Sequence, residues 1–263
     1  MTTATVAHGR VSTLSRITAL GRAELTLLLR SKASLFTVLF LPVIFTFAMR
    51  QPADELDLAG TGLTVGTVLV PASIGFVLIF AVYSNLVGVY VARREELVLK
   101  RLRTGEANDA ELLSANALPS MIVALVQSVL LLVGGAAVLD LEAPQRFDLV
   151  VVGVLLGLVM MSALAALSSR FAGTTESAQL IPLPMMMVSM LGSGVFVPLE
   201  VLPDRLAEIC RFLPLSPVME LVRGGWAGTL EGGDIAAALV IGLAWAVGSV
   251  LAVRRWFRWE PRS

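Results

Sequence analysis

Six long apolar stretches interrupt this chain, and they constrain its fold more than any other feature. The hydrocarbon core of a bilayer is about 30 Å thick, so an α-helix needs roughly 20 mainly apolar residues to cross it. Because backbone polar groups find no water there, such stretches must close their hydrogen bonds internally as helices. The predicted spans are Ala33–Met49, Leu63–Ala92, Leu112–Leu139, Leu149–Ser169, Ala178–Val197 and Ile235–Val253.

The composition agrees with lipid as the solvent. Only 15% of the residues are charged, whereas soluble domains average about 25%. We therefore predict an all-α integral membrane protein with six transmembrane helices. It forms one transmembrane domain over residues 1–263, with a tail and surface helix over 1–32, the spans over 33–254 and a second tail over 255–263.

The basic residues predict the orientation. In a six-span layout with an internal amino terminus, 15 of the 20 basic residues lie on the cytoplasmic side. Positive charge concentrates on that side of membrane proteins, so both termini are expected in the cytoplasm, in a multi-pass protein of the bacterial inner membrane. A five- or seven-span layout would place Arg254–Arg262 outside. The zero net charge gives no sign of nucleic-acid binding.

The segment Leu14–Leu28 precedes the first span and has an amphipathic pattern. Its apolar side chains gather on one side of a helical wheel, and Arg16 and Arg22 fall on the other. We expect a helix lying at the cytoplasmic surface of the membrane, and prefer it to a simple extension of the first span.

The connection Val195–Asp234 is rich in proline and in apolar residues. It is too apolar for a solvated loop and too often broken for a span. Short re-entrant helices that dip into the outer leaflet would satisfy both conditions, because irregular backbone at that depth must be covered by protein or water.

The chain lacks the residues that common catalytic sites need. It has no glycine-rich phosphate loop, and its only lysines are Lys32 and Lys100. His8 and Cys210 are each the only residue of their type, which argues against metal or redox chemistry. We therefore expect no catalytic, cofactor-binding or metal-binding residue in this chain. The spans are almost free of ionisable groups, which argues against an ion-coupled carrier.

A charged segment separates the second and third spans. Glu96 precedes Lys100 by four residues, a spacing that favours a helix. A rigid charged helix could dock on a soluble partner, although a simple topology anchor explains the charges equally well. The candidate docking residues are Arg93, Arg94, Glu95, Glu96, Lys100, Arg101, Arg103, Thr104 and Gly105.

Two stripes of side chains are candidates for lining a pore. The first, on the second span, comprises Phe76, Phe80, Tyr83 and Val87, and the second, on the fifth span, comprises Met186, Met190 and Ser193. Each has the spacing of a single helix face. Aromatic and methionine side chains offer an adaptable surface to bulky amphiphiles. Ordinary helix packing is the alternative, and apolar stripes favour it.

A motif between the fifth and sixth spans carries a family resemblance. It runs from Gly194 to Pro203, continues through Leu213–Pro217, and ends at Arg223; its marked residues are Gly194, Phe196, Pro198, Glu200, Pro203, Pro214, Pro217 and Arg223. This pattern resembles the type-2 ABC exporter permeases, the group with daunorubicin-resistance-like drug exporters. The segment Arg93–Gly105 resembles their cytoplasmic coupling helix, but Gly105-Glu106 replaces the small residue and proline that often follow the threonine.

The resemblance implies a permease subunit of an ATP-driven exporter with a hydrophobic or amphiphilic cargo, such as a drug, an antibiotic or a lipid-like molecule. A separate cytoplasmic ATPase subunit would dock on the coupling segment and would hold ATP and Mg²⁺. A second copy of the permease, or a sister permease, would complete the pore, which the second and fifth spans would line. Leu14–Leu28 would be the elbow helix. A membrane scaffold or sensor without transport activity remains an alternative, and an intramembrane lipid-modifying enzyme is less favoured.

Overall fold

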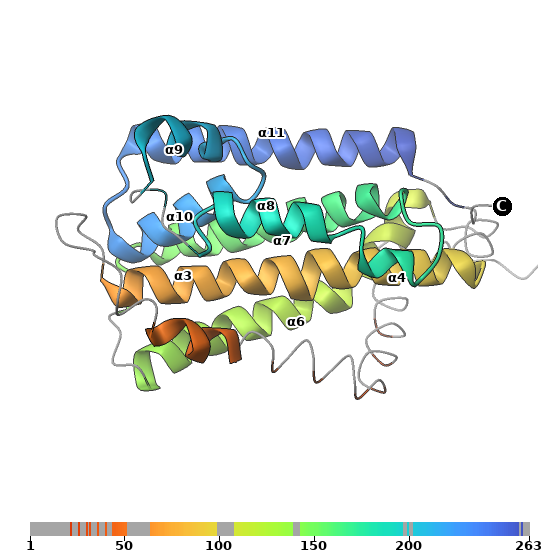
Figure 1. The fold of residues 1–263 in the computed structure, drawn as a ribbon, viewed down its shortest axis with the longest axis horizontal. Helices are drawn as coiled ribbons and strands as arrows, with labels where there is room; N and C mark the ends of the chain where they lie inside the picture. The colour runs from red at the N-terminus through yellow and green to blue at the C-terminus, as the bar shows by residue number, and fades with distance from the viewer. Residues whose placement is uncertain are drawn as a thin grey trace, which may run out of the picture.

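The computed structural model describes residues 22, 26, 30, 32, 36, 40, 44–51, 64–98, 108–138, 143–196, 199, 202–257 and 259. Within that part of the chain the regular structure is helical, and the long helices run side by side along one axis (Figure 1). The elements are α3 (Val65–Val77), the π-helix η1 (Leu78–Ser84), α4 (Asn85–Glu95), α6 (Asp109–Val138), α7 (Phe147–Ser169), the 3₁₀-helix η2 (Ser177–Gln179), α8 (Leu183–Gly192), α9 (Asp204–Arg211), α10 (Ser216–Ala227) and α11 (Gly232–Trp256).

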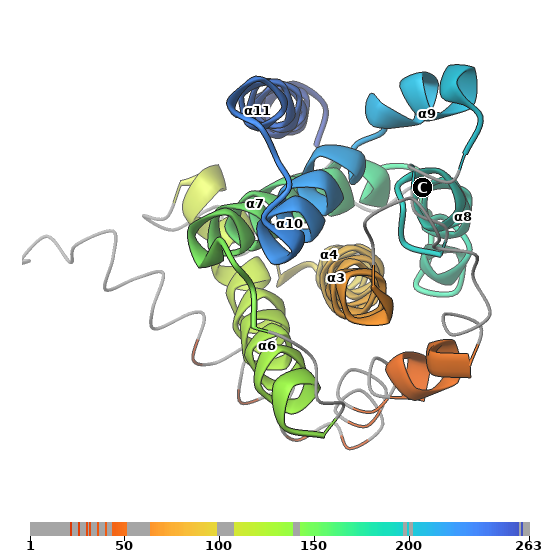
Figure 2. The same ribbon diagram turned by 90° about the vertical axis from the view of Figure 1, so that its left-hand side faces the viewer.

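The second predicted span is one continuous helix at the centre of the bundle. It runs through α3, η1 and α4, and Figure 2 shows α3 and α4 nearly end-on, with α6, α7, α8 and α10 around them. Thr64 and Thr67 form a capping box at its start, because each side chain bonds the other's backbone N–H. Most of this helix is buried by its neighbours.

Four helices in the described residues are long and apolar enough to cross a membrane: Val65–Glu95, Asp109–Gly134, Phe147–Ser169 and Gly232–Trp256. They correspond to the second, third, fourth and sixth predicted spans, within a few residues at each end. The first predicted span is described only in part, as helix at residues 36, 40 and 44–51. Most of Leu14–Leu28 lies outside the described residues; Arg22 and Thr26 are helical and exposed. The six-span layout with its elbow helix therefore stays a prediction.

The fifth predicted span, Ala178–Val197, is not a continuous helix. It consists of η2, a turn and then α8, which has only 10 residues. Pro182 and Pro184 explain the break, because proline has no backbone N–H and its ring clashes with the carbonyl four residues earlier. At 1.5 Å per residue α8 is about 15 Å long, half the thickness of the hydrocarbon core.

The connection before α11 contains α9 and α10, and α10 is buried against α7. Two glycines of α7 permit the close approach: a Cβ at Gly153 would lie 2.9 Å from Val222, and one at Gly157 would lie 3.0 Å from Val218. Small residues of this kind let membrane helices pack closely. Short helices were predicted here, but their re-entrant placement in the outer leaflet remains a prediction.

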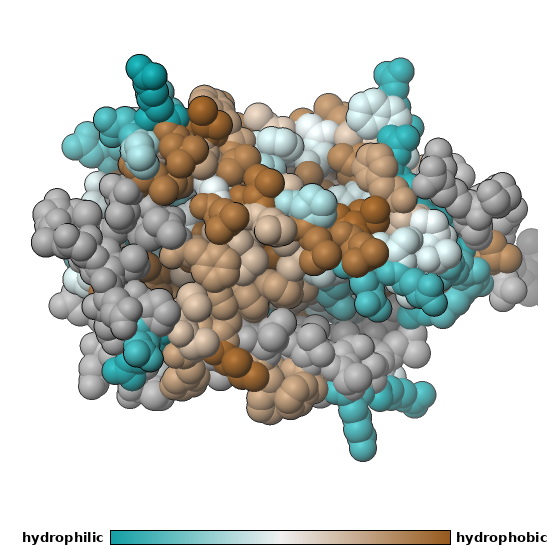
Figure 3. Space-filling model, in the orientation of Figure 1, coloured by the Kyte–Doolittle hydropathy of each residue, from teal (hydrophilic) through white to brown (hydrophobic). Residues whose placement is uncertain are grey.

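The molecular surface carries an apolar middle. Figure 3 shows hydrophobic side chains over the centre of one face and hydrophilic ones gathered toward its two ends. Large apolar side chains are also exposed along α6 and α11, among them Leu130, Val133, Val240 and Leu251. A surface of this extent is what lipid would cover.

Candidate functional site

The bundle has two ends, which we name after a buried arginine at each. The Arg94 end holds the end of α4, the end of α7 and the turn before α8, and the Arg223 end holds α9 and α10 (Figure 1). Both ends contain residues that the sequence singled out.

Arg94 lies in the last turn of α4 and is only 2% exposed. One Nη atom donates to the carbonyl of Ser169 at 3.1 Å, and the other donates to the carbonyl of Ala172. Ser169 ends α7, where helix carbonyls lack intrahelical partners and the dipole favours a cation. Arg94 therefore ties the end of the second span to the end of the fourth.

Glu95 adds a second tie to the same region. Its carboxylate accepts from the backbone N–H of Thr175 at 3.1 Å and from the Thr175 hydroxyl. The turn that carries Thr175 is held internally, because the Ser177 hydroxyl accepts from the N–H groups of Gly173 and Thr174, each at 3.0 Å. Two consecutive residues of α4 thus bind the connection between α7 and α8.

The predicted coupling helix differs from what is observed at its start. α4 ends at Glu95, then Glu96 and Leu97 form a turn, and Val98 is helical again. Leu97 has a φ of 57°, a left-handed conformation that ends a right-handed helix. Arg93 donates to exposed Glu96 at 3.0 Å. The remaining predicted docking residues lie outside the described part of the chain: Lys100, Arg101, Arg103, Thr104 and Gly105.

The aromatic stripe of the second span meets two different neighbours. Phe76 and Phe80 stack with ring centroids 4.2 Å apart, and Phe76 also stacks on Phe45 at 4.0 Å. The Tyr83 hydroxyl lies 3.0 Å from the Ser168 hydroxyl of α7. The π-helix η1 shifts the register between these residues, since its i→i+5 bonds place more residues in each turn. Phe76, Tyr83 and Val87 are buried, and Phe80 is half-buried.

The stripe on α8 is also partly enclosed. Met186 and Ser193 are buried, whereas Met190 is half-buried against the hydrophobic core. The hydroxyls of Ser189 and Ser193 are buried and have no hydrogen-bond partner among the described residues. The pore-lining role of both stripes stays a prediction. Phe80 and Met190 are the members whose side chains are still partly exposed.

At the Arg223 end the structure brings together two residues of the proline-rich motif. Arg223 on α10 is 4% exposed, and its guanidinium donates to the carbonyl of Gly194. Gly194 has a φ of 77°, which a side chain would strain, and a Cβ there would lie 3.0 Å from an Arg223 nitrogen. The arginine thus fastens α10 to the turn that follows α8.

The rest of that motif shapes the connection. Pro203 precedes α9, Pro217 lies in the first turn of α10, and Pro214 lies in the turn between these helices. Proline fits the start of a helix because the N–H there needs no partner. The ring of Phe196 is tilted against Phe45, with centroids 5.8 Å apart. Pro198 and Glu200 lie outside the described residues.

Sequence reasoning missed the partners of Arg94 and Glu95. The sequence feature that indicates this turn is the run Gly173-Thr174-Thr175-Glu176-Ser177, because threonine and serine side chains that bond the nearby backbone are typical of tight turns. Within the part of the chain that the structure describes, no group of three or more His, Cys, Asp or Glu side chains is placed to hold a metal ion.

Residues 15–226 match the model of the ABC-2 type transporter family, and this match covers well over half of the chain. This chain belongs to the ABC-2 type transporter family. No curated protein matches it at a significant level. The chain is therefore the permease of an ABC transporter, a multi-pass membrane protein and a transport component, and its family implies an ATPase partner.

Proposed function

We propose that this permease moves a hydrophobic or amphiphilic cargo outward, driven by ATP hydrolysis in a separate ATPase subunit that docks at the Arg94 end. A second copy of the permease, or a sister permease, completes the path. The excess of basic residues supports placing the Arg94 end and both termini in the cytoplasm of a bacterial cell.

The tie between α4 and the turn before α8 carries the mechanism. ATP changes the preferred conformation of the partner, and only contacts that differ between two states can transmit that change. A displacement of the segment after Glu95 pulls on α4. Because Arg94 and Glu95 hold the carbonyls of Ser169 and Ala172 and the N–H of Thr175, the end of α7 and the start of α8 move in the same step.

This route differs from the one that the sequence suggested, which passed from the coupling segment to the second and third spans. The observed contacts favour a connection toward α7 and α8. The half-buried Phe80 and Met190 lie on the two elements that such a movement would displace relative to one another. Soft side chains at those positions would suit varied apolar cargo.

Reconstitution tests the proposal. The permease and its P-loop ATPase partner, isolated by co-purification, are placed in proteoliposomes, and ATP-dependent movement of a fluorescent lipophilic cation is measured. We expect movement only with both subunits and ATP. Met190→Ala and Phe80→Ala should change the rate or the cargo range about two- to tenfold, since each removes an adaptable contact. Val240→Ala, on the exposed face of α11, is the control and should leave transport unchanged.

Two results would count against the proposal. An assembled complex that hydrolyses ATP without moving any amphiphile from a varied panel would indicate a scaffold or sensor. A carboxyl-terminal reporter that is active only outside the cell would contradict the orientation if it showed activity.

A further inference from the structure

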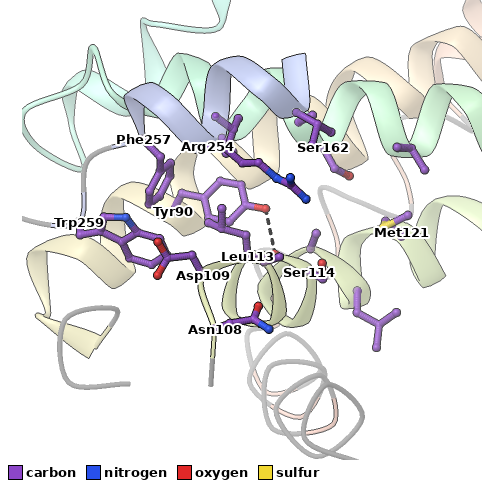
Figure 4. A pocket seen from close by; sticks show the side chains of 18 residues that line it. Tyr90, Asn108, Asp109, Leu113, Ser114, Met121, Ser162, Arg254, Phe257 and Trp259 are labelled. Atoms are coloured by element: carbon purple, nitrogen blue, oxygen red, sulfur yellow. Dashed lines mark hydrogen bonds between the residues drawn. The ribbon is translucent and has the colours of Figure 1, made fainter. Parts of the chain in front are cut away.

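A cavity of about 890 Å³ opens at the Arg94 end between α6, α7 and α11, and Tyr90 of α4 forms part of its wall (Figure 4). Cavities that bind small molecules are typically 300–1,000 Å³ in volume and mainly apolar. The apolar part of the wall here comes from Leu113, Met121, Val159, Val250 and Phe257. Both α6 and α11 pack on α7, and Figure 2 shows them on different sides of it.

The cavity contains one cation without an ion-pair partner in the described chain. The guanidinium of Arg254 points into the cavity (Figure 4), and no carboxylate of the described residues forms an ion pair with it. Two of the hydroxyl groups in the wall donate elsewhere: Tyr90 to the carbonyl of Leu113 at 3.1 Å, and Ser162 to the carbonyl of Leu158 at 2.7 Å. Asn108 and Ser114 add neutral polar groups, so among the described lining residues Arg254 is the positively charged donor for an anion.

The position of the cavity along the bundle indicates what reaches it. Arg254 lies in the last turn of α11, where the long apolar helix ends, and Trp259 and Phe257 stand in the same wall. Cations and aromatic side chains at the end of a span mark the level of the lipid headgroups. The wall residues Met121, Val159 and Val250 continue from there toward the apolar middle of the helices.

We propose that this cavity binds one glycerophospholipid, with its phosphate on Arg254 and the upper part of its acyl chains along Met121, Val159 and Val250. Guanidinium groups bind phosphate through paired hydrogen bonds. Phosphatidylethanolamine carries the phosphate and the two acyl chains that this site requires, and it serves as the probe. Under the proposed orientation the lipid comes from the cytoplasmic leaflet, but its binding does not depend on transport.

Native mass spectrometry of the delipidated full-length permease, titrated with phosphatidylethanolamine, tests this site. We expect the first phosphatidylethanolamine molecule to bind each permease more tightly than any further molecules do. Arg254→Gln should weaken that binding at least about tenfold, since it removes a charge-assisted hydrogen bond. Arg255→Gln is the matched control, because Arg255 is exposed on the same turn and does not line the cavity. Diacylglycerol, which lacks the phosphate, should bind at least about tenfold more weakly.

A second variant tests the cavity itself. Ser114 is exposed and lines the cavity, so Ser114→Leu fills space without disturbing the core, and it should also displace the lipid. Size-exclusion chromatography and thermal unfolding confirm that each variant is folded. Equal binding of diacylglycerol, equal losses for Arg254→Gln and Arg255→Gln, or full binding by Ser114→Leu would each overturn the proposal. Because the readout is binding, these results are independent of whether the permease transports cargo.

Discussion

The two ends of the permease are each fastened by a buried arginine, but the two fastenings are built differently. Arg94 is 2% exposed and holds two backbone carbonyls at the end of α7, and Glu95 beside it holds Thr175. Arg223 is 4% exposed and holds the carbonyl of Gly194, a glycine in a left-handed conformation.

This difference determines which substitutions each end tolerates. The carbonyls that Arg94 binds are present in any residue, so Ser169 and Ala172 contribute through the backbone and not through their side chains. At the other end the partner's identity matters, because only glycine adopts the φ of Gly194 without strain and leaves room for the guanidinium. The Arg94 end depends on one side chain, whereas the Arg223 end depends on a matched pair.

The largest effect is expected for Arg94→Ala. It removes the donor of two buried carbonyls, each worth about 1–3 kcal/mol, so it should destabilise the permease by about 2–6 kcal/mol. Arg94→Lys should have a stability between those of the wild type and Arg94→Ala, because an ammonium lacks the planar fork that reaches two acceptors. Thermal unfolding in detergent, followed by tryptophan fluorescence, measures both variants. Arg93→Ala is the control, because the Arg93 side chain is 19% exposed and donates to the exposed Glu96. An equal loss of stability in Arg93→Ala would remove the distinction between the two arginines.

Gly194→Ala is expected to have an intermediate effect. The left-handed backbone conformation costs a residue with a Cβ about 1–2 kcal/mol, and the added atom would also crowd Arg223. Gly134→Ala in α6 is the matched control, since a Cβ there meets nothing within 4 Å and alanine favours the helix by up to about 1 kcal/mol. The same unfolding measurement compares them. If both changes were neutral, the glycine at the Arg223 end would not be required.

The smallest effect on stability is expected for Glu95→Gln and Thr175→Val. Exposed polar contacts contribute about 0–1 kcal/mol, so each single variant and the double variant should remain folded and assembled. Cargo moved per ATP hydrolysed should nevertheless fall, and it should fall less for Thr175→Val, which keeps the backbone N–H bond to Glu95. The double variant should be no worse than Glu95→Gln, because both variants act on the same contact. Glu96→Gln, one residue beyond α4, is the control for loss of charge. If cargo moved per ATP hydrolysed were unchanged in all of these variants, Glu95 would not transmit the movement of α4, and Arg94 alone would do so.

The sequence predicted the long helices well, because their evidence is local. Each of the helices that begin at Val65, Asp109, Phe147 and Gly232 appears as an apolar run whose length fits a bilayer. The link between Gly194 and Arg223 was visible only as two parts of one motif. Their contact could not be predicted, since it depends on how α10 packs on α7.

Other features of the structure were not predicted, because a local signal was given too little weight. Pro182 and Pro184 were noted as distortions, yet together they break the fifth stretch. The spacing of Glu96 and Lys100 favoured a helix, and the turn that interrupts it at Glu96 and Leu97 was not foreseen. The helix expected toward Lys100 stays a prediction, because Lys100 lies outside the described residues. The aromatic stripe assumed 3.6 residues per turn throughout, and nothing in the apolar run Leu78–Ser84 announces a π-helix. Arg94 was grouped with docking residues because charge alone does not reveal burial.

The π-helix has a mechanical consequence. Lipid offers no hydrogen bonds, so a span that bends by breaking its backbone ladder exposes polar groups at high cost. Seven residues of η1 sit between two stiff α-helical segments, and a change between i→i+5 and i→i+4 bonding there exchanges partners without abandoning them. Such an exchange alters the twist between α3 and α4, and helix register shifts occur within microseconds to milliseconds. The central span can therefore allow α3 to rotate relative to α4 while every backbone N–H and C=O of the helix keeps a hydrogen-bond partner.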